Sequence, residues 1–111
     1  MRNLKKRISR KPQKKQNEEW QRFLTKAQDI FGRLALYEGK SPKLPGVQQL
    51  VEEWQKYINE HFYSCDEKML SCLGELYVSD ERFAAYINQF GKGNLAEFFR
   101  DAVREYCRKY D

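Results

Sequence analysis

The stretch "HFYSCDEKMLSCLGELYVSD", His61 to Asp80, contains the end of one predicted helix, a break and the whole of the next helix. Ser64 followed three residues later by Glu67 matches a capping box, in which a hydroxyl and a carboxylate accept hydrogen bonds from the free amides at a helix start. Apolar residues then recur at spacings of three and four. The pattern therefore predicts a helix from Cys65 to about Val78.

Two helices are predicted before this stretch. The first begins after Pro12 and ends around residues 37–39, and the second runs from near Pro45 to residue 61 or 62. The segment between them, "GKSPKLPG", is expected to be a loop because its prolines and glycines cannot continue a helix. Each helix carries one apolar stripe. The first stripe comprises Trp20, Phe23, Leu24, Ala27, Ile30, Phe31 and Leu34, and the second comprises Val47, Leu50, Val51, Trp54, Ile58 and Phe62.

Two more helices are predicted after the quoted stretch. Ser79 and Asp80 offer an N-cap for a short helix that contains Phe83 and Phe90 and is stopped by "GKGN". The last helix begins at Asn94, and its apolar residues keep the three-four spacing up to the charged C-terminus. No segment alternates with the period of two that a half-buried strand requires. The sequence thus predicts an all-α fold of about five helices that pack as neighbours.

The positive charge of the chain is concentrated at its N-terminus. The 111 residues have a formal net charge of +5, but residues 1–15 contain eight Lys and Arg residues and no acidic residue. The other 13 of the 21 basic residues face 16 acidic ones, so residues 16–111 carry about −3. We therefore expect a basic disordered lead over residues 1–15 and one folded domain over residues 16–111, with nucleic acid contacted only through the lead.

The composition indicates neither a membrane protein nor a secreted one. No apolar run approaches the ~20 residues that a membrane span requires, and no hydrophobic segment typical of a secretory signal follows the basic N-terminus. The three cysteines, Cys65, Cys72 and Cys107, are an odd number, whereas small secreted scaffolds carry an even and denser set. We expect a cytoplasmic protein with reduced thiols.

The spacing of Cys65 and Cys72 limits what the two thiols can do. Seven residues of helix separate them by roughly 10.5 Å along the axis, and a disulfide needs Cα atoms within about 7 Å. We expect no metal site, because the chain has one histidine, His61, and no C-x2–4-C pair. Two interpretations stay open, buried packing and reactivity. In the first turn of a helix Cys65 would be favoured as a thiolate, whereas Cys72 would need an electrophile held against it.

The segment "FYSCDEKMLSCLGELYVSDERF", Phe62 to Phe83, resembles the TipAS drug-recognition domain family, the effector-binding part of thiostrepton-induced MerR-type regulators. The resemblance rests on the aromatic pair before a cysteine in "FYSC" and on the motifs "LGELYV" and "DERF". The preceding "SPKLPGVQQLVEEWQKYI" and the closing amphipathic helix extend the similarity to roughly residues 17 to 109.

The resemblance implies a globin-like helical domain without haem, whose cleft takes large, flat, peptide-derived antibiotics such as thiopeptides. Some members of the family then trap a dehydroamino acid of the drug with a cysteine, which by position is Cys72. We expect Trp54, Phe62, Tyr63 and Tyr77 to line the cleft, with Cys72 as the covalent attachment site. The alternative for each ring is ordinary core packing.

The function implied by the resemblance is that of a stand-alone, monomeric domain that binds and sequesters an antibiotic without a cofactor and without turnover. We expect the domain to act without the winged helix-turn-helix and dimerisation helix of a full regulator, since Met1 to Lys15 stand at the position of those elements. The alternative is a regulatory or partner-binding module of a transcription regulator, whose basic tail contacts nucleic acid or protein. An enzyme is not expected, because His61 has no serine or cysteine partner in a nucleophile motif.

Overall fold

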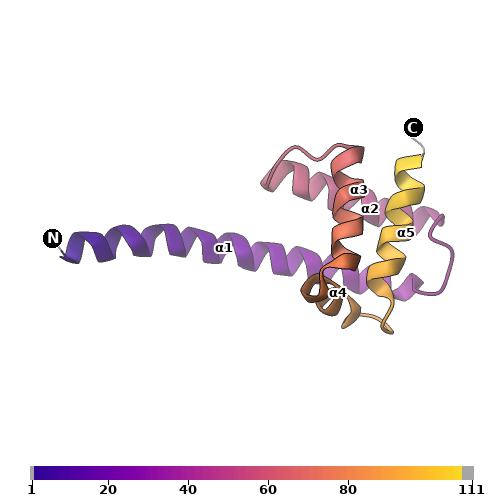
Figure 1. Ribbon diagram of the computed structural model, residues 1–111, viewed down its shortest axis with the longest axis horizontal. Coiled ribbons are helices and arrows are strands. Elements are labelled where there is room, and N and C mark those ends of the chain that lie inside the picture. Colours follow the sequence, from indigo (N-terminus) through magenta and orange to yellow (C-terminus); the bar gives the residue numbers. More distant parts are fainter. Residues whose placement is uncertain (1, 109–111) are drawn as a thin grey trace.

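The computed structural model describes the backbone of residues 2–108 and the side chains of residues 18–108. Within these residues the chain forms five α-helices and one short 3-10 helix (Figure 1). The all-α fold predicted from the sequence is therefore confirmed. The elements are α1 (Arg2–Leu34), η1 (Ala35–Tyr37), α2 (Pro45–His61), α3 (Glu67–Ser79), α4 (Glu81–Asn88) and α5 (Leu95–Arg108).

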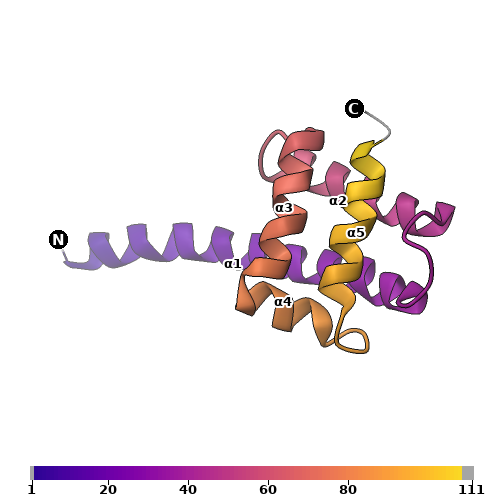
Figure 2. The same ribbon diagram turned by 45° about the vertical axis from the view of Figure 1, so that its right-hand side comes forward.

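The first helix begins earlier than the sequence predicted. α1 starts at Arg2 rather than after Pro12, and its N-terminal part extends away from the other helices (Figures 1 and 2). Lys, Arg and Gln have high helix propensity, and extending an existing helix costs far less than nucleating a new one. The side chains of residues 1–17 lie outside those described, so the division of the chain at residue 15 stays a prediction.

The second helix has the bounds that the sequence predicts, from Pro45 to His61. Pro45 occupies its first turn, where a missing N–H has no partner to lose. The helix ends at His61, and the N–H of Phe62 closes it by donating to the carbonyl of Ile58 at 3.0 Å. The buried face matches the predicted stripe except at two residues: Phe62 lies beyond the helix and is exposed, and Gln48 is buried although it was not part of the stripe. That face comprises Val47, Gln48, Leu50, Val51, Trp54 and Ile58.

The start of α3 differs from the prediction. Its N-cap is Asp66, whose carboxylate accepts a hydrogen bond from the Met69 N–H at 2.9 Å. The predicted capping box at Ser64 is wrong, because an aspartate two residues later is at least as good a cap and takes the same role. Glu67 instead accepts from the side-chain amide of Gln55 on α2 at 3.1 Å. The helix therefore begins two residues later than expected.

Asp80 serves both of the helices that it separates. Its backbone N–H donates to the carbonyl of Leu76 at the end of α3. Its carboxylate accepts from the N–H groups of Arg82 and Phe83 at the start of α4. A negative charge at this position also complements the positive end of the α4 dipole. The N-cap predicted here is confirmed.

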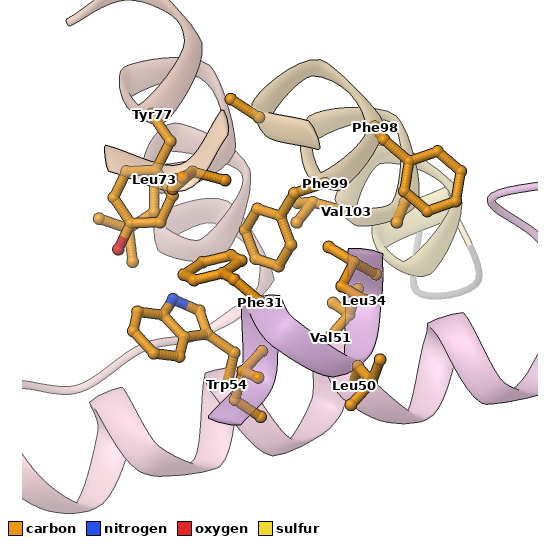
Figure 3. Close-up of a cluster of buried hydrophobic side chains, with 14 of the residues drawn as sticks. Phe31, Leu34, Leu50, Val51, Trp54, Leu73, Tyr77, Phe98, Phe99 and Val103 are labelled. Carbon is orange, nitrogen blue, oxygen red and sulfur yellow. The ribbon is translucent and has the colours of Figure 1, made fainter. Parts of the chain in front are cut away.

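Aromatic and aliphatic side chains of α1, α2, α3 and α5 fill the core (Figure 3). Phe31 of α1 lies with its ring centroid 5.2 Å from those of both Trp54 on α2 and Phe99 on α5. α3 packs closely against α5 at Gly74, where an added Cβ would lie in van der Waals contact with Val103 at 3.4 Å. Each of the two ring pairs that Phe31 forms contributes about 0.5–1.5 kcal/mol beyond its buried area. The rings therefore tie three helices together.

A carboxylate joins the end of η1 to the loop before α5. Glu38 accepts hydrogen bonds from the backbone N–H of Lys92 at 2.7 Å and of Asn94 at 3.1 Å. Gly91 lies against this carboxylate, and a Cβ at that position would collide with it. Hydrogen bonds to a charged acceptor are about twice as strong as neutral ones. The contact thus fixes where α5 starts relative to the connection between α1 and α2.

Replacing Glu38 by Gln should destabilise the fold. The change removes the charge and turns one acceptor oxygen into a donor that faces a backbone N–H. We expect E38Q to lower the free energy of unfolding by about 1–3 kcal/mol, measured by urea denaturation followed by circular dichroism. E52Q is the control, since Glu52 is an exposed carboxylate on α2. Equal stabilities for the two variants would contradict this role of Glu38.

Candidate ligand-binding pocket

Among the described residues, an apolar pocket of about 440 Å³ lies between α1, α2, α3 and α4. Its volume falls in the range of roughly 300–1,000 Å³ that small-molecule sites occupy. Most of its lining is aromatic or aliphatic. The lining comprises Trp20, Phe23, Leu24, Ala27 and Phe31 of α1, Trp54 of α2, Tyr77 of α3, and Arg82, Phe83, Tyr86 and Ile87 of α4.

The α1 wall is built on a pair of stacked rings. Trp20 and Phe23, one helical turn apart, have ring centroids 5.3 Å apart and an interplanar angle of 14°. Phe23 in turn meets Trp54 edge-on at 5.6 Å. Trp20 is 54% exposed, whereas Trp54 is fully buried. The wall therefore runs from solvent into the core, and a flat ligand can approach it from the Trp20 end.

The back of the pocket is a neutral aromatic surface formed by Phe31, Trp54 and Tyr77. All three side chains are buried. Burial raises the pKa of Tyr77, and the neighbouring indole N–H of Trp54 opposes this effect only in part. The phenol therefore stays protonated at neutral pH. No charge is buried at this end of the pocket.

The α4 wall adds one ring and the one charged residue of the lining. The Phe83 ring lies 5.1 Å from that of Tyr77. Arg82 has a side chain that is 94% exposed, with its Nε 3.7 Å from the Asp80 carboxylate. An ion pair at this exposure contributes little to stability. Arg82 thus marks the solvent edge of an otherwise uncharged pocket.

The structure brings together some of the residues that the sequence predicted for the cleft. Trp54 and Tyr77 line the pocket. Phe62 lies at its edge, where its ring meets Phe23 at 5.6 Å, and it is 44% exposed. Tyr63 is 47% exposed and lies near enough to Tyr77 to contribute to the raised pKa of that phenol. Neither of these two rings is part of the pocket wall.

The three cysteines have three different environments. Cys72 is exposed on α3 and does not line the pocket. Cys65 is buried in the loop before α3, where burial and then the charges of Asp66 and Glu67 raise its pKa. The expectation that the helix dipole favours a Cys65 thiolate is therefore wrong. The Cys107 thiol donates to the backbone carbonyl of Glu67 at 3.3 Å.

Sequence reasoning missed the contributions of α1 and α4 to the pocket. Phe23, Leu24 and Phe83 were predicted only as stripe residues of amphipathic helices. A helical stripe faces inward whether it meets another side chain or a cavity, so spacing cannot separate the two. No metal site was expected, and no group of three His, Cys, Asp or Glu side chains comes together in residues 18–108. Likewise, none of the helices in the described part of the chain is long and apolar enough to cross a membrane.

Comparison with known proteins assigns the family. A family model described as the TipAS antibiotic-recognition domain matches residues 3–106. The chain belongs to this family. The match begins closer to the N-terminus than the similarity seen from residue 17. It includes η1, α2, α3 and α4 whole, all of α1 except its first residue, and α5 except its last two residues.

Two transcription activators and one solved structure are similar to the chain. The HTH-type transcriptional activator mta of Bacillus subtilis is 33% identical over 90 residues, which are 81% of this chain and 35% of mta. The HTH-type transcriptional activator TipA of Streptomyces coelicolor is 38% identical over 88 residues, or 78% and 34% of the two chains. The chain thus spans about a third of the length of these relatives.

The solved structure is TipAS from Streptomyces lividans in complex with nosiheptide, part of a thiopeptide antibiotic multidrug resistance system. It matches with a TM-score of 0.75 and 33% identity, over 84% of this chain and 66% of that chain. The globin-like helical architecture implied by the sequence resemblance is confirmed by this match.

Proposed function

We propose that the chain binds thiopeptide-like or other large aromatic antibiotics in the pocket between α1, α2, α3 and α4, and thereby sequesters them. The observation that carries the proposal is the aromatic pocket, in a chain that matches nosiheptide-bound TipAS at a TM-score of 0.75. Arg82 is the one charged residue among those that line it. Such walls favour flat, uncharged ligands that stack on rings.

Desolvation of rings on both partners supplies the affinity. Each Å² of apolar surface removed from water contributes about 25 cal/mol, part of which offsets the cost of association. The exposed rings of Phe62 and Tyr63 offer apolar surface beyond the pocket itself. A ligand too large for the 440 Å³ pocket therefore buries one part of itself there and rests another part on these rings.

Cys72 enters the proposal as a site of covalent capture. Its thiol is exposed on α3, five residues before Tyr77, which places it about 7.5 Å away along the helix axis and about 140° around it, outside the pocket lining. The thiolate adds to the β-carbon of a dehydroalanine, the π electrons of the double bond move to the α-carbon, and that carbon takes a proton from water. No group leaves. One ligand is captured per chain, so the protein acts as a stoichiometric binder rather than as an enzyme.

A second role, as the effector-sensing part of a transcription regulator, is favoured by the relatives. Both mta and TipA are transcriptional activators, and the chain aligns with about a third of each. The same pocket serves in this role, while contact with nucleic acid or protein falls to residues 1–15. Retention on duplex DNA at low salt that disappears when residues 1–15 are deleted would favour this second role.

Titration with nosiheptide tests the pocket as the binding site. Trp54 and Trp20 both line it, so we expect saturable quenching of tryptophan fluorescence at one ligand per chain. Leu24 also lines the pocket and is half-buried. Replacing Leu24 by Ala removes apolar contact and should weaken binding about tenfold.

Leu36→Ala is the matched control for this titration, because Leu36 is 76% exposed and lies outside the pocket. We expect its affinity for nosiheptide to equal that of the parent chain. Equal affinities for the parent, L24A and L36A would contradict binding in this pocket. A complete absence of quenching and of binding heat would contradict antibiotic binding altogether.

Intact-mass spectrometry tests capture at Cys72. After incubation with nosiheptide, or with another thiopeptide that carries a dehydroalanine, we expect one adduct of the ligand's mass. Cys72→Ser should abolish the adduct and leave fluorescence quenching in place, whereas Cys107→Ser should keep both. An adduct that persists in C72S would show that a different residue reacts. An unmodified parent chain that still binds would restrict the function to reversible binding.

A further inference from the structure

The segment between α2 and α3, residues 62–66, carries two exposed rings beside the pocket. The Phe62 ring lies 5.6 Å from that of the pocket residue Phe23. Tyr63 is 47% exposed and lies close to Tyr77. Because the segment is not helical, its shape depends on which groups bind its backbone N–H and C=O groups. The positions of both rings therefore depend on those contacts.

Two side chains of α2 bind the backbone of Cys65. The Cys65 N–H donates to Asn59 Oδ1 at 2.9 Å, and the Cys65 carbonyl accepts from Gln55 Nε2 at 3.0 Å. The Cys65 side chain is itself buried. Earlier in the segment, the N–H of Tyr63 donates to the carbonyl of Ile58 at 3.2 Å. Tyr63 thus lies between one contact at its own N–H and a second contact two residues later.

Gln55 connects this second contact to α5. Its Nε2 also donates to Glu67 Oε2 at 3.1 Å, and its Oε1 accepts from the Tyr106 hydroxyl of α5 at 2.9 Å. The two acceptors of Nε2, a carbonyl and a carboxylate, cannot donate, so the amide has one favourable orientation. In that orientation the Tyr106 hydroxyl is the donor that holds the amide oxygen.

The C-terminal end of α5 lies beside the start of α3. The two helices run side by side (Figures 1 and 2), and the Cys107 thiol donates to the carbonyl of Glu67 at 3.3 Å. Tyr106 is 6% exposed, so its bond to Gln55 is largely shielded from water. Breaking such a bond leaves a polar group without its partner and is costly. α5, which has no residue among the described lining of the pocket, is thereby linked to the segment that carries the rings.

We propose that Gln55 and Tyr106 are positioning residues for ligand binding. They hold residues 62–66 in the shape that places Phe62 and Tyr63 as a continuation of the aromatic pocket surface. The inference rests on the proposed antibiotic binding and assigns a role in it to two residues that do not line the pocket. The network acts on ligands large enough to reach the two rings.

Loss of the Tyr106 hydroxyl should loosen the segment without removing a ring. Gln55 Oε1 would then bind water, and the amide would separate more easily from the Cys65 carbonyl. A ligand that contacts the two rings must order the loosened segment again, and this cost lowers its affinity. The network therefore favours large ligands over ligands that stay within the pocket.

Tyr106→Phe tests the proposal, because it removes the hydroxyl and keeps the ring. We expect Y106F to bind nosiheptide about 3- to 10-fold more weakly than the parent chain in a fluorescence titration. Tyr37→Phe is the matched control, since Tyr37 lies on η1 outside the pocket, and we expect it to keep the parent affinity. Equal affinities for the parent and Y106F would overturn the proposal and leave binding in the pocket intact. A parent chain that does not bind nosiheptide would instead refute the proposed function together with this inference.

A double-mutant cycle separates positioning from a general effect on the fold. The double variant Phe62→Ala/Tyr63→Ala removes both rings and should weaken nosiheptide binding in the parent chain. If Tyr106 acts through the rings, the same double change should cost little further affinity in Y106F. Fully additive losses would contradict the proposal, because Tyr106 would then affect binding by another route.

Amide hydrogen exchange supplies a measurement that needs no ligand. Cys65 and Ala96 each have a backbone N–H that donates to an asparagine side chain, Asn59 and Asn88 respectively. We expect Y106F to accelerate exchange at Cys65 about tenfold relative to Ala96, because only the first lies in the loosened segment. Equal acceleration at the two amides would indicate a global loss of stability and would count against positioning.

Gln55→Glu is the second variant and decides the question if Y106F does not fold. It keeps the acceptor for the Tyr106 hydroxyl and replaces the amide N–H groups by an oxygen that faces the Cys65 carbonyl and the Glu67 carboxylate. We expect Q55E to weaken nosiheptide binding at least as much as Y106F, by about 3- to 10-fold. A folded Q55E chain that binds as tightly as the parent would overturn the proposal.

Discussion

The packing of rings around Trp54 is the interaction on which both the core and the pocket depend. Its indole is fully buried on α2 and contacts Phe23 and Phe31 of α1, Tyr57 of its own helix and Tyr77 of α3. One face of this cluster continues into the core through Phe31, and the other forms the back of the pocket. Because the same side chain serves both, the shape of the pocket is set by the packing that stabilises the fold.

The apolar stripe of α1 contributes to the core at one end and to the pocket wall at the other. Ile30 and Leu34 near its C-terminal end are fully buried in the core, whereas Trp20 and Phe23 are partly or largely exposed and form the pocket wall. Arg33 links the buried half to α2 through Glu53, with Nη2 2.8 Å from the carboxylate. The buried half of α1 thus positions the less buried half. A ligand that displaces Trp20 or Phe23 there removes fewer packing contacts than one that displaces a core side chain.

The sequence predicted the helices better than the site, for reasons that can be traced to single residues. Three-four spacing and the Asp80 cap are local signals, and they gave the number and order of the helices. The start of α3 was missed because Ser64 and Asp66 are both good caps, and local sequence does not rank them. The wrong prediction for Cys65 followed from that error, because Cys65 lies before the helix and not in its first turn. Trp54 and Tyr77 were found through the family resemblance, but Phe23 and Phe83 reach the pocket only through tertiary packing, which periodicity does not encode.

The central claim is that the aromatic pocket beside Trp54 receives the antibiotic. Intermolecular nuclear Overhauser effects in a complex of the isotope-labelled chain with unlabelled nosiheptide measure this contact directly. The account predicts cross-peaks from ligand ring protons to Leu24, Tyr77 and Phe83, on three different helices of the pocket. Cross-peaks confined to residues outside the lining, such as Phe98 of α5, with unperturbed signals from the pocket, would contradict it.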